Sequence, residues 1–407
     1  MRCFPPILSR SPVLLGALGL AVAGWCSEDK KPPPKPPLPD PAAVSAKAAI
    51  IIDEISGKVL WSKNPEAPRF PASTTKIMTA MLMIERCWPN DIVTAPADIE
   101  KVGEASLHLK PQEQLSVREL LWGILLRSAN DGSVAAAVHC SGSVESFCAK
   151  MNERAKQIGC TGTNFTNPNG LKDPLHVTTA RDLALMAREA MRYPEFREIV
   201  RQRKHTIVRS INQADTQLIS KNKFLQIDPT ADGIKTGFTR PAGQCFVGSA
   251  SRGGARFITV VLGSEDWLGD TAKLTNYGFN AYEVRRASKA GEPISERLLL
   301  TSGSIAVGPV RAVRYVARKG DSVSPTIEPK FAAVSGTIRR GDQVGVLHVT
   351  DGMGWTDEVP LVALESTEVR KGSAGSKAPL YVLGACLAGA WAYSRKQRRR
   401  MYARFSR

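Results

Sequence analysis

The stretch after Pro71 restricts the fold more than any other part of this sequence. Apolar side chains recur there at helical spacing, and no charged residue lies between Ile77 and Ile84. A helix that is apolar on all sides needs other structure around its whole circumference. The sequence therefore predicts a buried helix at the centre of a domain.

Strand-like runs flank a helical middle part of the chain. Two come first, joined by a turn that contains Ser56 and Gly57, and three come later, the first two of them joined by a turn at 240–243. A two-stranded hairpin is marginal alone, so we expect one antiparallel sheet with the helical segment packed against it, an α/β sandwich. The predicted strands are 48–52, 58–61, 233–238, 244–249 and 256–262.

Two capping boxes indicate where helices of the middle part begin. Ser116 stands three residues before Glu119, ahead of the apolar run 120–126, and Thr179 stands in the same relation to Asp182, ahead of 183–191. We therefore expect one helix to begin at each of these pairs.

The length of 407 residues exceeds what one ordinary core fills, which indicates two domains with terminal appendages. Short β-rich pieces broken by glycines, such as 312–317 and 343–347, follow residue 286. We predict a main domain over 44–286 and a small all-β domain over 287–370.

The N-terminal residues have the pattern of a secretory signal. Arg2 and Arg10 precede an apolar stretch over 13–23, which ends in small residues typical of a cleavage site. We predict a signal peptide over 1–23, with an uncleaved N-terminal anchor as the alternative, and hence export of the body. Prolines crowd the next segment, so 24–43 is predicted to be an extended linker.

An apolar, uncharged segment and a basic tail close the sequence. The segment 378–394 carries aromatic residues near its ends and is predicted to be a single transmembrane helix, with an interfacial helix as the alternative. Much of the net charge of +17 lies in the tail 395–407, which the positive-inside rule places in the cytoplasm. The sequence thus predicts a body on the extracytoplasmic, periplasmic face of a bacterial membrane. No nucleic-acid partner is expected, because neither a zinc-finger spacing nor aromatic residues interleaved with basic ones occur.

Cysteine and histidine spacing indicates no metal site or cofactor. Oxidation is permitted in an exported body, so a disulfide is one interpretation of the cysteines, and small buried apolar residues are the other. The cysteines concerned are Cys87, Cys140, Cys148, Cys160 and Cys245.

Three short motifs carry the chemistry. They are Ser73-Thr74-Thr75-Lys76, then Ser128-Ala129-Asn130, then Lys235-Thr236-Gly237. The spacing of the first motif also occurs by chance at 220–223, and that of the second at 62–64 and 210–212. The order of the motifs and their context must therefore distinguish them from chance matches.

The first motif opens the buried helix, which places the Ser73 hydroxyl at a helix N-terminus and Lys76 on the same face one turn later. Burial lowers the pKa of a lysine, so Lys76 is predicted to act as the base that activates Ser73 as a nucleophile. The alternatives are an ordinary helix cap for Ser73 and a solvated charge for Lys76.

The second motif lies between two helical stretches, where a loop presents Ser128 and Asn130 to a ligand, although these residues also suit a helix cap. The third lies on a strand beside the turn, where Gly237 leaves room for a substrate backbone. A plain edge strand guarded by Lys235 is its alternative.

Together, in this order, the motifs are those of penicillin-binding proteins and serine β-lactamases. The sequence from about residue 48 to 284 resembles the low-molecular-mass D-alanyl-D-alanine carboxypeptidases, and the β-rich segment after it resembles their C-terminal domain. The segments that carry the resemblance are 53–63, 71–79, 128–131, 167–171 and 232–239.

The resemblance implies the α/β sandwich of the penicillin-binding protein and serine β-lactamase type, and a role for each motif. Ser73 is the acylated nucleophile and Lys76 its base. Ser128 and Asn130 relay the proton and contact the substrate amide, whereas the third motif binds substrate. The oxyanion hole uses backbone amides, that of Ser73 among them.

The function that the resemblance implies is removal of the terminal D-alanine from peptidoglycan stem peptides, with β-lactams acylating the same serine. The alternatives are a D,D-endopeptidase, a weak transpeptidase, or a β-lactam receptor or wall-binding scaffold that does not hydrolyse its substrate. A β-lactamase is disfavoured, because no Glu-x-x-Leu-Asn-like deacylation element follows the second motif.

One departure from the family concerns the substrate carboxylate. Family members often carry an arginine shortly after the third strand, whereas this chain has Glu265, Asp266 and Asp270 there. A desolvated carboxylate needs a charged or hydroxyl partner. We hypothesise that Arg240 holds it with the hydroxyls of Thr236 and Thr239, the alternative being a solvated turn residue. The predicted substrate-binding residues are therefore Lys235, Thr236, Gly237, Thr239 and Arg240.

Overall fold

The computed structural model describes residues 44–300, 303–322, 324–334, 336–351 and 355–369. The predicted signal peptide, linker, transmembrane helix and basic tail all lie outside these described residues. Within the described ranges, no helix has both the length and the apolarity that a membrane crossing requires.

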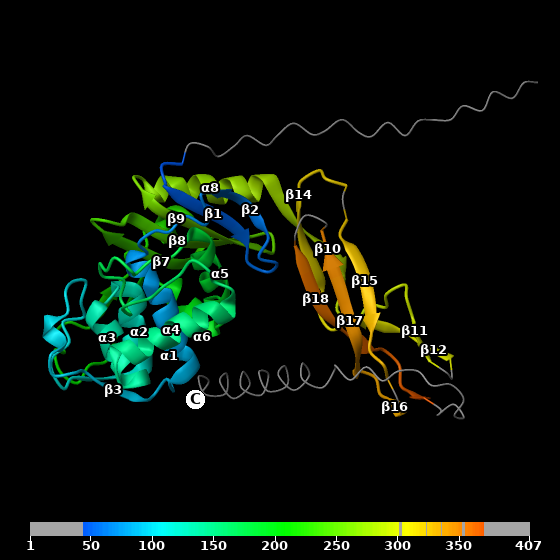
Figure 1. Ribbon diagram of the computed structural model, residues 1–407, viewed down its shortest axis with the longest axis horizontal. Helices are drawn as coiled ribbons and strands as arrows, with labels where there is room; N and C mark the ends of the chain where they lie inside the picture. The colour runs from blue at the N-terminus through cyan, green and yellow to red at the C-terminus, as the bar shows by residue number, and fades with distance from the viewer. Residues whose placement is uncertain (1–43, 301–302, 323, 335, 352–354, 370–407) are drawn as a thin grey trace, which may run out of the picture. The chain divides into compact units, whose positions relative to one another are not determined.

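An antiparallel sheet of five strands organises the main domain (Figure 1). The early hairpin pairs with the late strands as predicted, because β1 lies beside β9 and brings residues far apart in the sequence together. In sheet order the strands are β2 (Val59–Lys63), β1 (Ala48–Asp53), β9 (Ala255–Ser264), β8 (Gly243–Arg252) and β7 (Ala231–Thr239).

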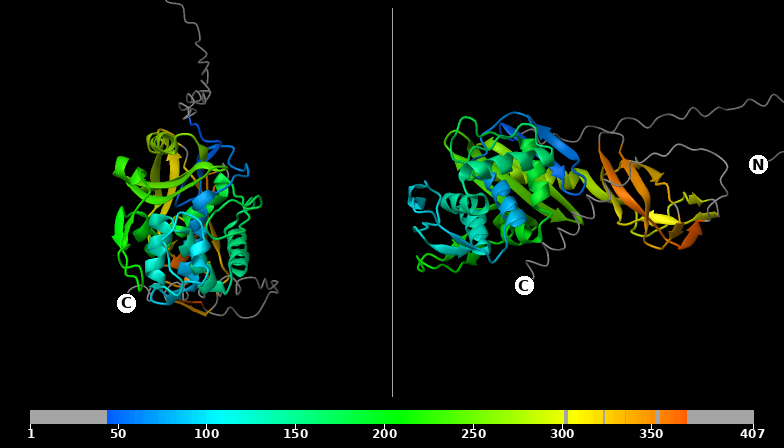
Figure 2. Two further views of the ribbon diagram at one scale, coloured as in Figure 1. Left: turned by 90° about the vertical axis from the view of Figure 1, so that its left-hand side faces the viewer. Right: turned by 60° about the horizontal axis from the view of Figure 1, so that its bottom comes forward.

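Helices cover both faces of this sheet. In Figures 1 and 2, α8 (Trp267–Ala281) lies on one face and the other long helices lie on the opposite face. Side chains alternate between the faces, since Ile50 joins the core under the helical layer and Ala49 the smaller core under α8. The helices of the larger layer are α1 (Lys76–Arg86), α2 (Val117–Trp122), α3 (Asn130–Ser141), α4 (Val144–Ile158), α5 (Ala180–Ala190) and α6 (Pro194–Val200).

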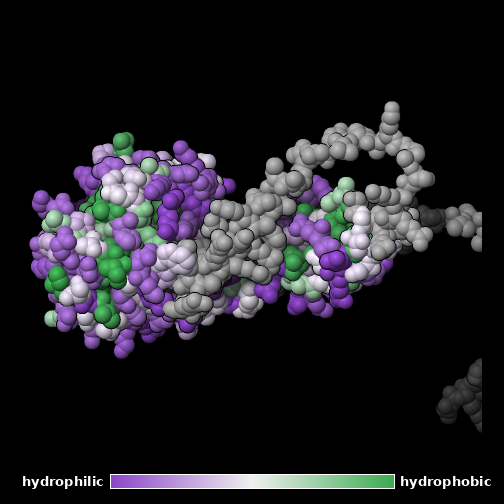
Figure 3. All heavy atoms as spheres, turned by 90° about the horizontal axis from the view of Figure 1, so that it is seen from below, coloured by the Kyte–Doolittle hydropathy of each residue, from purple (hydrophilic) through white to green (hydrophobic). Residues whose placement is uncertain are grey.

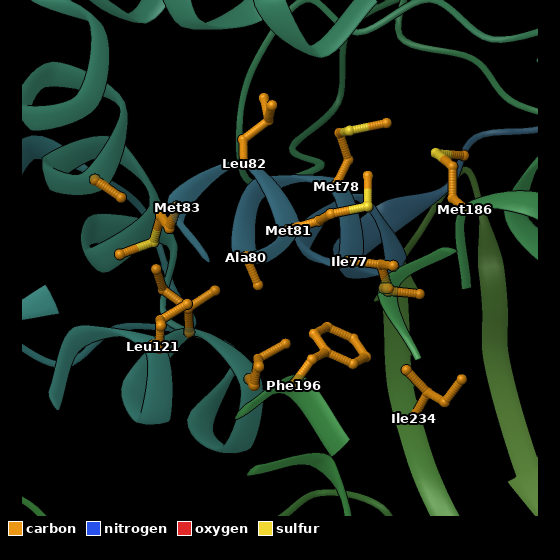
Figure 4. Close-up of a cluster of buried hydrophobic side chains, with 14 of the residues drawn as sticks. Ile77, Met78, Ala80, Met81, Leu82, Met83, Leu121, Met186, Phe196 and Ile234 are labelled. Carbon is orange, nitrogen blue, oxygen red and sulfur yellow. The ribbon is translucent and has the colours of Figure 1, made fainter. Parts of the chain in front are cut away.

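Helix α1 is buried, as its sequence predicts. Figure 4 shows Ile77, Met81 and Leu82 projecting from it in different directions, and Phe196 and Ile234 belong to the same core. The predicted capping boxes are confirmed for α2 and α5, whose N-cap hydroxyls accept from the backbone amide three residues later.

Small elements complete the main domain. A buried ion pair joins two of its loops, because Arg209 donates two hydrogen bonds to Glu113 and both side chains are inaccessible to solvent. The small elements are β3 (Ile92–Thr94) with β4 (Gln114–Ser116), β5 (Lys204–Thr206) with β6 (Gln217–Ile219), α7 (Phe224–Ile227), a π-helical turn at Gly123–Arg127, and 3₁₀ turns at Ala72–Thr75 and Ile99–Lys101.

The segment after residue 281 is all β within its described residues. Strand β10 (Tyr282–Ser288) pairs with β14 (Val313–Arg318), so the boundary expected at residue 286 falls inside a strand. A four-stranded sheet has the order β13 (Val307–Pro309), β18 (Thr356–Ala363), β17 (Gln343–Thr350) and β15 (Thr326–Phe331). Two short pairs accompany it, β11 (Leu298–Leu300) with β12 (Gly303–Ile305) and β16 (Gly336–Ile338) with β19 (Thr367–Val369).

The cysteines of the described residues divide between the two interpretations. A disulfide joins Cys87, directly after α1, to Cys140 in α3. Cys148, Cys160 and Cys245 are free and buried, as small apolar residues would be.

The face of the main domain seen in Figure 3 is largely hydrophilic, with hydrophobic atoms gathered in patches. Several large apolar side chains of this domain are exposed, among them Leu175, Val208 and Phe238. Phe238 follows Gly237 on β7 and lines the cleft described next.

Candidate active site

The three motifs meet at one cleft of about 710 Å³. Ser73 lies there in the 3₁₀ turn that precedes α1, not in the α-helix itself as predicted. In this turn Ala72 has a positive φ of 48°, and the amide of Lys76 donates to the carbonyls of Ser73 and Thr74. This tight turn leaves Ser73 partly exposed while its neighbours are buried.

Lys76 begins α1, and its side chain is inaccessible to solvent. Three oxygen atoms surround its Nζ: Ser73 Oγ at 3.0 Å, Asn130 Oδ1 at 2.7 Å and the Asn169 carbonyl at 2.6 Å. Burial holds the pKa of Lys76 well below its usual range, and the charges of Lys235 and Lys221 lower it further.

The three contacts fit a neutral amine. Such a group has two N–H donors and one lone pair, and the two carbonyl-type oxygens accept without being able to donate. Nζ is the donor in all three contacts, as an ammonium with three N–H groups would be. In the neutral form that burial favours, two N–H groups would serve Asn130 and Asn169, and the lone pair would be left for the Ser73 hydroxyl. That orientation is the one a general base requires.

The second motif links the π-helical turn to α3. Ser128 has a left-handed backbone with φ of 70° and lines the cleft. The side-chain amide of Asn130 donates to the carbonyls of Gly103 and Glu104, at 2.9 and 2.7 Å, while its oxygen accepts from Lys76. Asn130 thus orients Lys76 here, and would have to release a carbonyl before contacting a substrate amide.

The third motif lies on β7, at the edge of the sheet. The strand passes so close to the 3₁₀ turn at Ser73 that a Cβ on Gly237 would lie 3.0 Å from the amide nitrogen of Ser73. Lys235 is buried and donates to the carbonyl of Thr236, and burial followed by the charge of Lys221 lowers its pKa to about 7. Thr236, Gly237 and Thr239 line the cleft.

A loop that the sequence singled out only by resemblance completes the site. Gly170 has φ of 86°, and a Cβ on it would lie 1.8 Å from the carbonyl oxygen of Ala72, so only glycine fits. Behind it, His176 Nε2 lies 2.8 Å from Thr75 Oγ1, and Nδ1 accepts from the amide of Thr166 at 3.0 Å. The loop that supplies the Asn169 carbonyl is therefore fixed to the 3₁₀ turn that carries Ser73.

Arg240, the predicted carboxylate anchor, and Asp270, from the segment where the family often has an arginine, are both absent from the cleft lining within the described ranges. Arg240 is exposed in the turn after β7 and is absent from the described residues that line the cleft, so its role stays a prediction. Asp270 is buried and accepts hydrogen bonds from the amides of Ser45 and Ala46 and from the hydroxyl of Ser264. Asp270 therefore has a structural role.

Several cleft residues were missed by sequence reasoning. Lys221 and Lys223 line it, although their segment satisfied the first motif's spacing only by chance. Glu104 and Trp267 line it too, with no local signal to find them. In the part of the chain described, no group of three or more His, Cys, Asp or Glu side chains is placed to hold a metal ion.

Residues 35–266 match the family model described as D-alanyl-D-alanine carboxypeptidase, peptidase S11, which covers more than half of the chain. The chain belongs to this family. The D-alanyl-D-alanine carboxypeptidase DacF of Bacillus subtilis is 31% identical over 337 residues, which span 79% of this chain and 86% of that protein.

Solved structures agree with this membership. A crystal structure of penicillin binding protein 5 from Haemophilus influenzae has a TM-score of 0.67 and 27% identity, covering 81% of this chain and 98% of that one. A mutant of the Streptomyces K15 DD-transpeptidase has a TM-score of 0.56 and 28% identity, covering 58% and 98%. The predicted fold, an antiparallel sheet with helices followed by an all-β region, is confirmed.

For this D-alanyl-D-alanine carboxypeptidase family member, the geometry suits acyl transfer. The Ser73 hydroxyl, a buried lysine 3.0 Å from it, and an open strand edge meet at one cleft. Such a site is able to hold an extended peptide along β7 while its carbonyl lies near Ser73.

Proposed function

We propose that the protein is a serine D-alanyl-D-alanine carboxypeptidase, which removes the terminal D-alanine from peptidoglycan stem peptides through an acyl-enzyme on Ser73. The 3.0 Å contact between Ser73 Oγ and the buried Lys76 Nζ carries this proposal. Family membership and the relatives' names support the substrate class.

In the first step, Ser73 Oγ attacks the penultimate D-alanine carbonyl while Lys76 takes the hydroxyl proton. The backbone amide of Ser73 is one donor to the oxyanion. The C–N bond then breaks, an ester forms, and the leaving amine receives a proton by way of Ser128, which lines the same cleft. In the second step, water hydrolyses the ester with Lys76 again as base, which frees the shortened peptide.

The strand at the cleft edge has a separate role in the proposal. Thr236, Gly237 and Thr239 bind the peptide backbone and its carboxyl end, and Lys235 supplies positive charge to them. Its pKa of about 7 means that this charge is only partly present at neutral pH. β-Lactams acylate Ser73 as mimics of the substrate.

A nucleophile test distinguishes Ser73 from the chance match to its motif. Ser73→Ala should abolish both D-alanine release from a pentapeptide and covalent penicillin labelling, whereas Ser220→Ala should retain both. Labelling that persisted in Ser73→Ala would place the nucleophile elsewhere.

Two rival functions use the same acyl-enzyme. A D,D-endopeptidase differs only in its substrate, and a weak transpeptidase only in its acyl acceptor. The likeness to the Streptomyces DD-transpeptidase favours the transpeptidase as the second candidate. Product analysis with a cross-linked peptide, and with an acceptor amine present, separates these activities. A receptor without hydrolysis would stay acylated, so the lifetime of the acyl-enzyme decides that case.

The location is also proposed. Residues 1–23 would direct export and 378–394 would anchor the body to the extracytoplasmic face, with the tail 395–407 in the cytoplasm. A chain ending before Lys377 and lacking its signal should leave the membrane fraction and keep its activity on soluble peptides. A truncated protein that still pelleted with membranes would place the anchor elsewhere.

A further inference from the structure

Glu104 carries the only carboxylate among the described residues that line the cleft. The other charged side chains in that lining are Lys221 and Lys223, and both are cations. Opposite charges attract and like charges repel, so a positively charged group of the substrate has one side chain of opposite charge to contact there. The loop of Glu104 is the part of the cleft wall that suits a substrate ammonium.

The Glu104 carboxylate is open to a ligand. Its side chain is 71% exposed, and its ion partner is His108, whose Nδ1 lies 3.6 Å away in a side chain that is itself exposed. Within the described ranges, no lysine or arginine lies within ion-pair distance of this carboxylate. Burial lowers the pKa of Lys221, and the charge of Glu104 opposes that change, so the two residues act on the same space. A substrate ammonium would therefore replace water and an exposed histidine and would break no buried ion pair.

The backbone that carries Glu104 is held beside the reacting groups. Its carbonyl accepts from the side-chain amide of Asn130 at 2.7 Å, and Asn130 Oδ1 accepts from Lys76 at 2.7 Å. The loop is also tied to the buried Asp131, which accepts from the hydroxyl of Ser106 at 2.6 Å. Two hydrogen bonds thus connect Glu104 to the base, and its carboxylate extends from a backbone that is already positioned.

The stem peptide carries a cation at a matching place. The residue before its two D-alanines is a diamino acid, whose side-chain amine is free until it is acylated in a cross-link. When the penultimate carbonyl lies at Ser73, this residue is the next one along the bound peptide. Its ammonium ends a flexible chain, four carbons long in lysine, and the cleft that holds the peptide against Gly237 is also lined by Glu104.

We propose that the Glu104 carboxylate binds the free side-chain ammonium of the diamino acid that precedes the two D-alanines, and that the enzyme thereby prefers stem peptides in which this amine is free. This inference rests on the proposed function. An acylated amine is a neutral amide and gains no ionic contact with Glu104. Stems already joined to a neighbour through this amine are therefore the poorer substrates.

Two tripeptides that differ by one acetyl group test the contact on the full-length enzyme. Nα-acetyl-L-lysyl-D-alanyl-D-alanine has the free ammonium, and the Nα,Nε-diacetyl peptide lacks it. The ratio of their kcat/KM values for D-alanine release cancels any loss of folded protein. The wild type should prefer the free amine about two- to fivefold, the range of an exposed ion pair, and high salt should reduce that preference. Glu104→Gln should abolish it.

Matched variants make the result specific. Glu100 is also exposed, its carboxylate lies 2.7 Å from Lys110 Nζ, and it is absent from the described residues that line the cleft. Glu100→Gln should therefore keep the wild-type ratio. Glu104→Lys should reverse the preference, because it repels the ammonium. A ratio that falls in Glu100→Gln and not in Glu104→Gln would overturn the assignment.

Other outcomes separate the two proposals. Equal losses on both peptides in Glu104→Gln would mean that Glu104 acts on the chemistry through Asn130 and Lys76, which overturns ammonium binding. A wild-type enzyme that releases D-alanine without preferring the free amine, or whose preference is insensitive to salt, overturns it as well. A wild-type enzyme that releases no D-alanine from either peptide refutes the proposed function itself.

Discussion

Acidification should weaken the fold through one buried histidine behind the nucleophile. His176 is 1% exposed and lies between the hydroxyl of Thr75 and the amide of Thr166. Because Nδ1 accepts from an amide, Nε2 carries the hydrogen and donates to Thr75. Protonation would put a second hydrogen on Nδ1, facing the Thr166 N–H, and burial accordingly lowers the pKa of His176 to about 4.

The direction of the stability change with pH follows from which state binds the proton more tightly. The pKa is 6.5 in the unfolded chain and about 4 in the folded one, so the unfolded chain binds the proton first as the pH falls. Stability is therefore lost between these two values and is unaffected by this group above them. A difference of about 2.5 units corresponds to at most about 3.4 kcal/mol, of which about 2.4 kcal/mol is lost between pH 7 and pH 4.5.

Urea unfolding followed by tryptophan fluorescence measures this loss at pH 7 and pH 4.5. His176→Gln should be less stable at pH 7, because the imidazole contacts are disturbed, but its free energy of unfolding should fall by about 2 kcal/mol less on acidification. Other titrating groups are common to both proteins and cancel. Parallel losses in the two proteins would refute the assignment of His176 as a buried neutral imidazole.

Three further predictions concern single side chains. Gly170→Ala should lower both the melting temperature and the rate of penicillin acylation, since its Cβ would overlap the Ala72 carbonyl; unchanged values would contradict the close approach. Lys76→Met should slow penicillin acylation about a hundred- to ten-thousandfold. In the wild type the acidic limb of the acylation profile should lie well below pH 10.5, the usual lysine pKa, and a limb near that value would refute a neutral base. Arg209→Met should cost about 3 to 5 kcal/mol of unfolding free energy by leaving Glu113 buried without its partner. The double variant with Glu113→Leu should recover most of that, and a single variant as stable as the wild type would count against the pair.

The parts of the fold with a local signal were predictable from the sequence. The cap at Thr179 depends on a residue three positions away, and the strand Ala231–Thr239 depends on its own apolar pattern and the turn after it. The burial of α1 also followed from its composition alone. In each case the interactions that determine the element join residues close together in the sequence.

The parts that depend on distant contacts were not predictable from local patterns. Nothing near Lys221 distinguishes its motif match from chance, and only the packed structure places it in the cleft wall. The Asn169 carbonyl is a backbone atom 93 residues from Lys76, so no side-chain pattern identifies it. The turn at Ser73 is 3₁₀ and includes Ala72 with a positive φ, at the place where Gly170 approaches, and the pattern of apolar residues predicts none of these features.

The three oxygens around Lys76 Nζ come from three separate stretches of chain, at Ser73, Asn130 and Asn169. Acylation by a β-lactam thus requires all three stretches to be assembled at once, and a molecule in which one is misplaced has every residue yet stays unlabelled. A fluorescent penicillin consequently counts correctly assembled molecules in a refolding or expression experiment. Comparing the labelled fraction with total protein reports folding yield without any enzymatic turnover.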